Sequence, residues 1–528
     1  MTTETVAPQR SPLTSERESF WHLVHAEWTK FRTVRGWVIA AGVTIVAITA
    51  FVFVSSDVSS SCVGPGGPSG CPVQPTGPGG VPVIDAFYFA HQPVTGSGTI
   101  TVQMTSLTGQ VEVGQAGNGP PRMGPGLEPW SKAGIIIKEN TSQGSAYAAM
   151  MVTGSNGVRM QWDYVNDTPG LTGRVSASAP RWLRLVRDGG TITGYDSADG
   201  AHWTPVGTAT LPGLTSTVQA GLFAAGSFYD SSFCTEDSSF CTRATGVFRH
   251  IGLSWPATGW TGTNVGGPNF GVPAPGALRQ SAGELTVASF GDIGPAAGSA
   301  YGGTGLSLQR ALAGTFFGMI PLIVVAAMFI TAEYRRRLIW VSLTAAPRRG
   351  RLLAAKAVVI GAIGFVAGLV AAALAIAIGL PLLRRAGPLA WPVSLLTEAR
   401  MVVGTGALLA LAAVLALAIG TIAARSAPAV ALVIVVIIVP YMFAFGPLAG
   451  SQPQGSGPGG GGGWPLQISP AAALSVQQAV PQFHQLSAVY PLAAGYYPLA
   501  PWAGLAVECG WAAAALVLAF FLLRRRDA

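Results

Sequence analysis

The residues with the clearest chemistry in this 528-residue chain are the bases of the stretch Thr331–Lys356. The stretch holds seven Lys or Arg residues and one acid, Glu333. Arginines at this density bind carboxylates or lipid phosphates, and insertion keeps a short basic loop between two membrane spans on the cytoplasmic side. Its flanks, Ala311–Ile330 and Ala357–Leu380, are apolar and long enough as helices to cross a hydrocarbon core of about 30 Å. We therefore expect a cytoplasmic loop here.

Groupings that would support catalysis or metal binding are weak. The four lysines form no GxxxxGK[ST] motif, which predicts that the chain has no phosphate-binding loop of its own. The six histidines form no HExxH motif, and His22 and His25 suit a membrane interface better than a metal. Acids such as Asp163 and Asp199 lie at predicted turns, whereas a glycosidase needs two carboxylates across a cleft. We expect no catalytic residues, no metal and no cofactor bound by this chain.

Four of the five cysteines lie in one slightly acidic segment. If this segment is outside the cell, two disulfides are expected, most simply Cys62 with Cys71 and Cys234 with Cys241, although four cysteines allow three connectivities and free thiols are the alternative. The second pair lies in a tandem copy, DSSFCTE followed by DSSFCTR. Its oxygen donors fit either a Ca²⁺ site or, more simply, a stapled surface loop.

Composition places the chain among membrane proteins, because 49% of residues are hydrophobic, only 10% are charged and the mean hydropathy is +0.45. The net charge of +8 follows membrane topology: the expected cytoplasmic parts hold sixteen Lys or Arg and six acids, whereas Ser55–Arg310 holds twelve bases and fifteen acids. The positive charge therefore gives no reason to expect nucleic-acid binding.

The elements that must position the basic loop are six apolar runs with both termini in the cytoplasm. They are Trp37–Val54, Ala311–Ile330, Ala357–Leu380, Met401–Ala423, Ala427–Leu448 and Ala503–Leu523. This topology leaves Arg384, Arg385 and Arg400 outside, against the usual charge rule. Residues 449–502 form an external segment, in which Ile468–Pro481 fits a surface or a re-entrant helix.

The cytoplasmic N-terminus, residues 1–36, contains the alternation of aromatic and basic residues Phe20–Arg35. This pattern is typical of an amphipathic helix on the inner leaflet, or of a simple charged flank. Its expected interface residues are Trp28, Lys30, Phe31 and Arg32.

Residues 55–80 and 256–310 are rich in Gly and Pro and are expected to be linkers around a domain at 81–255. Inside that domain Val158, Met160 and Trp162 alternate with polar residues, as in a half-buried strand. Turn signals recur at Ser155–Gly157, Arg187–Gly190 and Ala198–Gly200, which favours an all-β sandwich. The blocks PWSKAGIIIKE, SAYAAMMVTGSNGVRMQW and APRWLRLVRDGG resemble the concanavalin A-like lectin and glucanase jelly rolls. The resemblance implies this fold and possible binding of envelope glycan.

The membrane part resembles the permease subunit of ABC-2-type transporters. The resemblance rests on AEWTKFRTVRGW before the first span, AEYRRRLIWVSLTAAPRRGRLLAAK between the second and third spans, and the six-span plan. It implies a separate cytoplasmic ATPase, which uses the ATP, and a homodimer or paired permease. The implied ATPase-coupling residues are Glu333, Tyr334, Leu338, Ile339, Trp340, Arg348, Arg349 and Arg351. The arginines fit contacts with acids of the ATPase or with lipid headgroups, and Glu333 is expected to pair with Arg32, Arg35 or Lys356.

Glu508 is the one acid inside an expected span, and such groups are functional candidates because they are costly to bury. The predicted fold class is an α-helical membrane protein of six transmembrane helices, with an all-β jelly-roll sandwich inserted between the first and second spans. The predicted function is export of a hydrophobic or amphiphilic compound by a multi-pass permease in the cell membrane. The alternatives are a non-transporting anchor that displays a carbohydrate-binding module and, less favoured, a membrane-tethered glycosidase.

Overall fold

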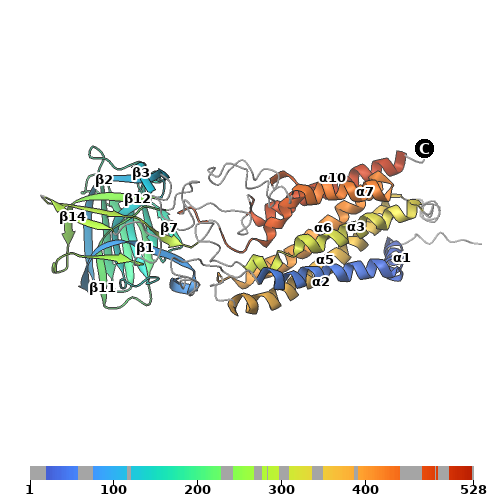
Figure 1. The fold of residues 1–528 in the computed structure, drawn as a ribbon, viewed down its shortest axis with the longest axis horizontal. Helices are drawn as coiled ribbons and strands as arrows, with labels where there is room; N and C mark the ends of the chain where they lie inside the picture. The colour runs from blue at the N-terminus through green and yellow to red at the C-terminus, as the bar shows by residue number, and fades with distance from the viewer. Residues whose placement is uncertain are drawn as a thin grey trace, which may run out of the picture.

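The computed structural model describes residues 20–56, 75–115, 121–227, 242–266, 276–281, 283–296, 308–335, 349–385, 391–440, 467–481, 483–485, 497 and 499–525. The chain forms two parts, a β-sandwich and a bundle of long helices (Figure 1). Helix α1 (Phe20–Thr33) and the C-terminal end of helix α10 (Pro501–Arg525) lie at the end of the bundle farthest from the sandwich.

The helical part contains five described helices that are long and apolar enough to cross a membrane. They are α2 (Arg35–Ser56), α3 (Thr315–Arg335, preceded by η4, Leu308–Leu312), α5 (Arg349–Arg385), α6 (Leu395–Ala423) and α10 (Pro501–Arg525). Each helix contains one of the expected apolar runs, except that α3 begins four residues after the start of its run, Ala311–Ile330. For the fifth run, Ala427–Leu448, the structure describes α7 (Ser426–Val433) and the π-helix η5 (Ile434–Ile438), and residues 441–448 lie outside the described part. The total of six spans therefore stays a prediction.

Small residues allow the long helices to approach closely. A Cβ built on Gly364 or Gly368 of α5 would lie 2.8 Å from a carbonyl oxygen of α6. On α3, a Cβ built on Gly318 would lie 2.3 Å from a side-chain carbon of Ile48 in α2. The Ala- and Gly-rich composition of the spans thus gives tight helix contacts, because larger side chains would force the backbones apart.

The sandwich consists of two antiparallel sheets, which is consistent with the expected jelly-roll-like domain. One has the order β13-β1-β11-β4-β5-β6-β7, with β16 also paired to β1; the other has the order β10-β9-β8-β2-β12-β15-β14, with β3 also paired to β2. The strands are β1 (Val83–Thr95), β2 (Gly98–Gln115), β3 (Pro121–Pro125), β4 (Lys132–Lys138), β5 (Tyr147–Thr153), β6 (Val158–Trp162), β7 (Asn166–Pro169), β8 (Arg181–Asp188), β9 (Thr191–Ser197), β10 (Thr204–Thr210), β11 (Thr217–Ala225), β12 (Thr242–Leu253), β13 (Thr261–Val265), β14 (Ala277–Ser281), β15 (Glu284–Ser289) and β16 (Asp292–Pro295).

Local sequence pattern explains much of this sandwich. Val158 and Met160 of β6 are buried in the core between the sheets, with Trp162 packed at its margin. The three predicted turns join β5 to β6, β8 to β9 and β9 to β10. The expected boundary at residue 255 is wrong, because β13 to β16 lie within the range predicted as a linker. The described Gly266, Gly283 and Gly291 of this range have positive φ angles at the ends of these short strands.

The segment after α7 returns to the bundle as the 3₁₀ helix η7 (Pro470–Gln477), all of whose residues are buried. This burial excludes the surface-helix alternative for this region. Gln485 continues toward the sandwich, where its amide Nε2 donates to the carbonyl oxygens of Tyr164 (3.4 Å) and Val165 (3.1 Å), between β6 and β7. Gln485 is itself buried, so the segment that follows η7 is in direct contact with the sandwich here.

Candidate functional site

The main polar site of the bundle is a set of four charged side chains at its α1 end, Glu27, Lys30, Glu333 and Lys356, which we call the ion cluster. Lys356 Nζ lies 2.6 Å from Glu27 Oε2 and 2.7 Å from Glu333 Oε1. Lys30 Nζ lies 2.6 Å from Glu27 Oε1 and 3.1 Å from Glu333 Oε1. Two bases and two acids balance each other, and only Lys30 has a substantially exposed side chain.

Three helices position the ion cluster. Glu27 lies on the buried face of α1 one turn before Phe31, Glu333 is in the last turn of α3, and Lys356 is in the second turn of α5. Two aromatic rings lie beside the ion cluster: Lys356 Nζ is 4.7 Å from the centre of the Phe329 ring, and this ring also contacts Phe31. These neighbours exclude water, so the charges depend on one another for compensation.

Burial disfavours the charged form of Lys30, but hydrogen bonds and the charges of Glu27 and Glu333 outweigh burial and raise the pKa of Lys30 above its ordinary value. Lys30 therefore stays protonated, and the cluster keeps its balance of charge. The arrangement has no nucleophile or metal-binding geometry; it joins helices by charge. Within the described residues, no three His, Cys, Asp or Glu side chains are grouped to hold a metal ion.

The ion cluster confirms one of the expected partners of Glu333. Lys356 pairs with it, whereas the described ion pairs of Glu333 include neither Arg32 nor Arg35. Glu27 was not among the residues predicted from the sequence. Its signal is the spacing to Lys30 at i+3 and to Phe31 at i+4, which places acid, base and aromatic ring on one helical face.

Of the other expected interface residues of α1, Phe31 is buried, whereas Trp28 and Arg32 are exposed. Trp28 is 44% exposed and its ring stacks on Phe31 at 6.5 Å, and Arg32 is exposed. Trp21 is 69% exposed, so α1 presents aromatic side chains outward as well as Phe31 inward. This arrangement suits a helix at the edge of a membrane or against a partner.

The expected coupling loop is described only at its ends. Leu338, Ile339, Trp340 and Arg348 lie outside the described residues; Tyr334 is half-buried beside the helical core, and Arg351 is exposed. Arg349 Nη1 donates to the carbonyl oxygens of Leu523 (3.0 Å) and Arg524 (3.4 Å) in the last turn of α10, where a cation also complements the helix dipole. The structure thus joins the first turn of α5 to the last turn of α10.

Glu508 lies far from the ion cluster. The C-terminal end of α10 lies at the α1 end of the bundle, as the ion cluster does (Figure 1). Glu508 is 16 residues before Arg524 in that last turn, which corresponds to about 24 Å along the helix. Its side chain is 1% exposed, and its Oε2 has no hydrogen-bond partner among the described residues. One turn earlier, a Cβ on Gly504 would lie 2.0 Å from the carbonyl oxygen of Ala472 in η7, so this face of α10 is packed against η7.

A second polar contact was not predicted from the sequence. Gln477 Nε2, at the end of η7, donates to Thr315 Oγ1 of α3 (2.8 Å) and Thr405 Oγ1 of α6 (3.0 Å), and all three side chains are buried. Single Thr and Gln residues in apolar surroundings carry little sequence signal. Their pairing satisfies polar groups that would otherwise be costly in this position.

The predicted disulfide cysteines, Cys62, Cys71, Cys234 and Cys241, lie outside the described residues, as does most of the tandem copy. Cys509 on α10 is an exposed free thiol.

Comparison with solved structures gives only weak likeness. A functionally unknown protein from Saccharomyces cerevisiae aligns over 32% of this chain and 74% of its own, with 13% identity and a TM-score of 0.19. Scytalido-glutamic peptidase with a transition state analog inhibitor aligns over 39% of this chain and 98% of its own, with 6% identity and a TM-score of 0.24. Scores this low support no conclusion about fold or activity.

No curated protein matches the chain. A family model described as ABC-2 family transporter protein does match, over residues 140–528, which is most of the chain. The matched range includes the expected coupling loop, α5, α6, α10 and much of the sandwich. The chain therefore belongs to the ABC-2 transporter family.

Proposed function

We propose that this chain is the permease subunit of an ATP-driven exporter, with the ion-cluster end in the cytoplasm and the sandwich outside the cell. Membership of the family makes it a membrane-spanning transport subunit that pairs with an ABC ATPase subunit. The proposed cargo is a hydrophobic or amphiphilic compound, because the spans are apolar and rich in Ala and Gly. A homodimer or a paired permease completes the transporter.

The ion cluster is the observation that carries this proposal. It ties α1 to α3 and α5, the two helices on either side of the basic loop, through three interhelical ion pairs of 2.6 to 3.1 Å. A displacement of the loop or of α1 is then transmitted to all three helices, because each charge of the cluster pairs with two others and moving one helix away would weaken these buried contacts. This is a suitable linkage between an ATPase and the spans.

The proposed contacts with the ATPase come from both sides of the cluster. Arg348, Arg349 and Arg351 would meet acids of the partner or lipid headgroups, while Leu338, Ile339 and Trp340 would supply apolar contact. The exposure of Arg351 supports this role. Arg349 already donates to the end of α10, which supports a part in holding the loop in place.

The sandwich is proposed to bind either the exported compound or an envelope glycan. Its contact with Gln485, in the segment between η7 and α10, supports a part in the work of the transporter. Glu508 is proposed to line the cargo path, because its buried carboxylate has an oxygen without a described partner.

The test is co-expression with a candidate ABC ATPase from the same genome, followed by purification in nanodiscs and measurement of ATP hydrolysis. We expect a stable complex whose ATPase rate differs from that of the ATPase alone. Lys30→Met should uncouple hydrolysis from the permease, because Lys30 links α1 to α3 yet is exposed enough for its loss to be tolerated.

Arg35→Met is the matched control, since it removes the same charge from a nearby exposed position that has no described bond to the cluster. Absence of any complex, with the variants unchanged, would favour the membrane-anchor alternative. Equal uncoupling by both variants would show that charge near α1 matters and that the ion cluster does not.

A further inference from the structure

Three residues between η7 and α10, Phe483, His484 and Gln485, reach from the helices to the sandwich, and we call them the strap. At one end, the Phe483 ring stacks on Trp391, with ring centres 5.6 Å apart and an interplanar angle of 29°. Trp391 is 7% exposed and precedes Ser394, the N-cap of α6. At the other end, Gln485 bonds to the turn between β6 and β7, and Figure 1 shows β7 on the side of the sandwich that faces the helices. The strap therefore links the start of α6 to this turn.

The turn that the strap holds is strained. Asp163 and Tyr164 have φ angles of +46° and +68°. This left-handed conformation is uncommon for residues other than glycine, above all for a bulky one, and it persists only where the surroundings impose it. Gln485 Nε2 donates to the carbonyl oxygens of Tyr164 and Val165. The strap thus fixes two successive peptide groups of the strained turn.

The Tyr164 side chain ties the same turn to the strands where the chain enters and leaves the sandwich. Its hydroxyl lies 2.6 Å from Asp85 Oδ2 and accepts from Lys138 Nζ at 3.0 Å, and all three side chains are buried. Asp85 lies opposite Ile293 in the ladder between β1 and β16. Among the described strands, β1 is the first after α2 and β16 is the last before α3. The turn is therefore connected to the chain on the α2 and α3 sides as well as to the strap.

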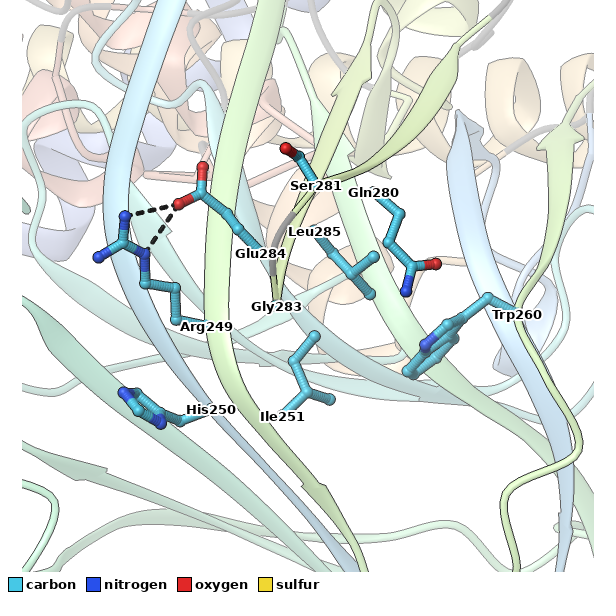
Figure 2. Close-up of a pocket in the computed structure, with 9 residues that line it drawn as sticks. All are labelled: Arg249, His250, Ile251, Trp260, Gln280, Ser281, Gly283, Glu284 and Leu285. Atoms are coloured by element: carbon cyan, nitrogen blue, oxygen red, sulfur yellow. Dashed lines mark hydrogen bonds and ion pairs between the residues drawn. The ribbon is translucent and has the colours of Figure 1, made fainter.

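A polar pair on the far side of the sandwich shows the contrast. Figure 2 shows Arg249 paired with Glu284, close to β14, which lies away from the helices in Figure 1. This pair joins the neighbouring strands β12 and β15, and its side chains are 55% and 29% exposed. Water can replace such an exposed contact, so its loss has little effect. The bonds at the β6–β7 turn are buried and join distant parts of the chain, so a change there is not compensated by water.

The helix at the other end of the strap is connected to the ion cluster. A Cβ built on Gly364 or Gly368 of α5 would lie 2.8 Å from a carbonyl oxygen of α6, so the two helices are in close contact. Lys356, a member of the ion cluster, is on α5. Movement of α5 is thus passed to α6, because packed helices deform little.

We propose that the strap is a conformational device that holds the β6–β7 turn in its strained form in one state of the transport cycle and releases it in another. The inference rests on the proposed transporter function. When the start of α6 moves, Trp391 carries Phe483 with it and Gln485 leaves the turn. The strain at Asp163 and Tyr164 then relaxes, and the start of β1 loosens through the bond to the Tyr164 hydroxyl. The sandwich in this way responds to events at the opposite end of the bundle.

The first test measures hydrogen exchange at residues 163–166 of the full-length protein in nanodiscs without an ATPase. Trp391→Ala removes the partner of Phe483 at the helix end of the strap and should raise this exchange about fivefold or more, because the turn opens more easily. Trp502→Ala is the matched control, since it truncates a ring that is 60% exposed on α10, and it should leave the exchange unchanged. Gln485→Leu should give the same rise as Trp391→Ala and keeps the test valid if that variant misfolds. Wild-type exchange in Gln485→Leu, or an equal rise in Trp502→Ala, overturns the inference.

The second test separates release of strain from simple loss of a contact. In the Gln485→Leu background, Asp163→Gly should reduce the rise in exchange, because glycine adopts a positive φ without strain. Asp163→Ala is the matched control: it also removes the carboxylate but keeps the strain, and it should not reduce the rise. Equal exchange in the two double variants would show that strain has no part in the device.

The third test uses the complex with the ATPase. Exchange at residues 163–166 should differ between the nucleotide-free and the vanadate-trapped complex, and Trp391→Ala should abolish this difference. A complex that hydrolyses ATP but shows the same exchange in both states overturns the inference and leaves the proposed function standing. Absence of a complex contradicts the proposed function, and the variants without an ATPase then decide on the strap.

Discussion

At the scale of single residues, Lys356 has the strongest expected effect on stability. Its ammonium group is fully buried between Glu27 and Glu333. Lys356→Met should therefore lower the free energy of unfolding by roughly 3–5 kcal/mol, because two carboxylates lose their buried partner. Equilibrium unfolding in mixed micelles measures this change.

Arg351→Met is the control for that experiment, because Arg351 is exposed on the same helix. Replacing all three buried charges, with Glu27→Gln, Glu333→Gln and Lys356→Met together, should recover much of the lost stability. A single Lys356→Met variant as stable as Arg351→Met would show that the buried pairs are not coupled as described.

His91 gives the sandwich a dependence on pH. Burial lowers the pKa of His91 below its ordinary value of 6.5, although its bond to Gln219 Oε1 opposes this shift. The neutral ring also contacts Thr263 Oγ1 at 2.9 Å and so joins β1 to β11 and β13. Its contribution to stability is present above the ordinary pKa and is lost as pH falls through the lowered value.

The melting temperature of the sandwich should therefore fall between about pH 7.5 and pH 5, and His91→Gln should reduce this fall. His202→Gln should not reduce it, because Asp199 raises the pKa of His202 and gives it the opposite pH dependence. Thermal unfolding followed by tryptophan fluorescence checks both variants. An identical fall in wild type and His91→Gln would exclude His91 as the cause.

At the scale of elements, the contact between α10 and η7 depends on a glycine. A Cβ at position 504 would lie 2.0 Å from the Ala472 carbonyl oxygen and 2.2 Å from Ser475 Oγ. Gly504→Ala should therefore push α10 away from η7 and destabilise the bundle by about 1–3 kcal/mol. Gly510→Ala is the control, since a Cβ there meets no atom within 4 Å and Ala favours a helix. Equal stability of the two variants in a thermal-shift assay would contradict this packing.

At the scale of the whole molecule, Gln485 connects the sandwich to the segment between η7 and α10. Its two hydrogen bonds reach Tyr164 and Val165, and the Tyr164 hydroxyl lies 2.6 Å from Asp85 Oδ2 at the start of β1. Gln485→Leu should loosen this joint while both parts stay folded. Hydrogen exchange should then rise at residues 163–166, whereas His484→Ala, at an exposed neighbouring position, should leave it unchanged. Unchanged exchange in Gln485→Leu would show that the contact is not needed to hold the two parts together.

The sequence by itself determined the kinds of elements and most of their limits. Long apolar runs predicted the five described spanning helices, and the alternation around Met160 with its flanking turns predicted strands of a sandwich, because both signals are local in the chain. The same local reasoning gave a wrong domain boundary at residue 255, because the Gly- and Pro-rich composition of the next segment predicted a linker where the structure has four short strands. Family motifs, and not periodicity, indicated the transporter class.

The tertiary structure alone decided which residues act together. Glu27 meets Lys356 across 329 positions, and Gln485 meets Val165 across 320 positions. No local pattern specifies such pairs, because each side chain alone reads as an ordinary surface charge or amide. Their roles arise from burial, which removes water as an alternative partner and makes each polar group depend on one distant residue.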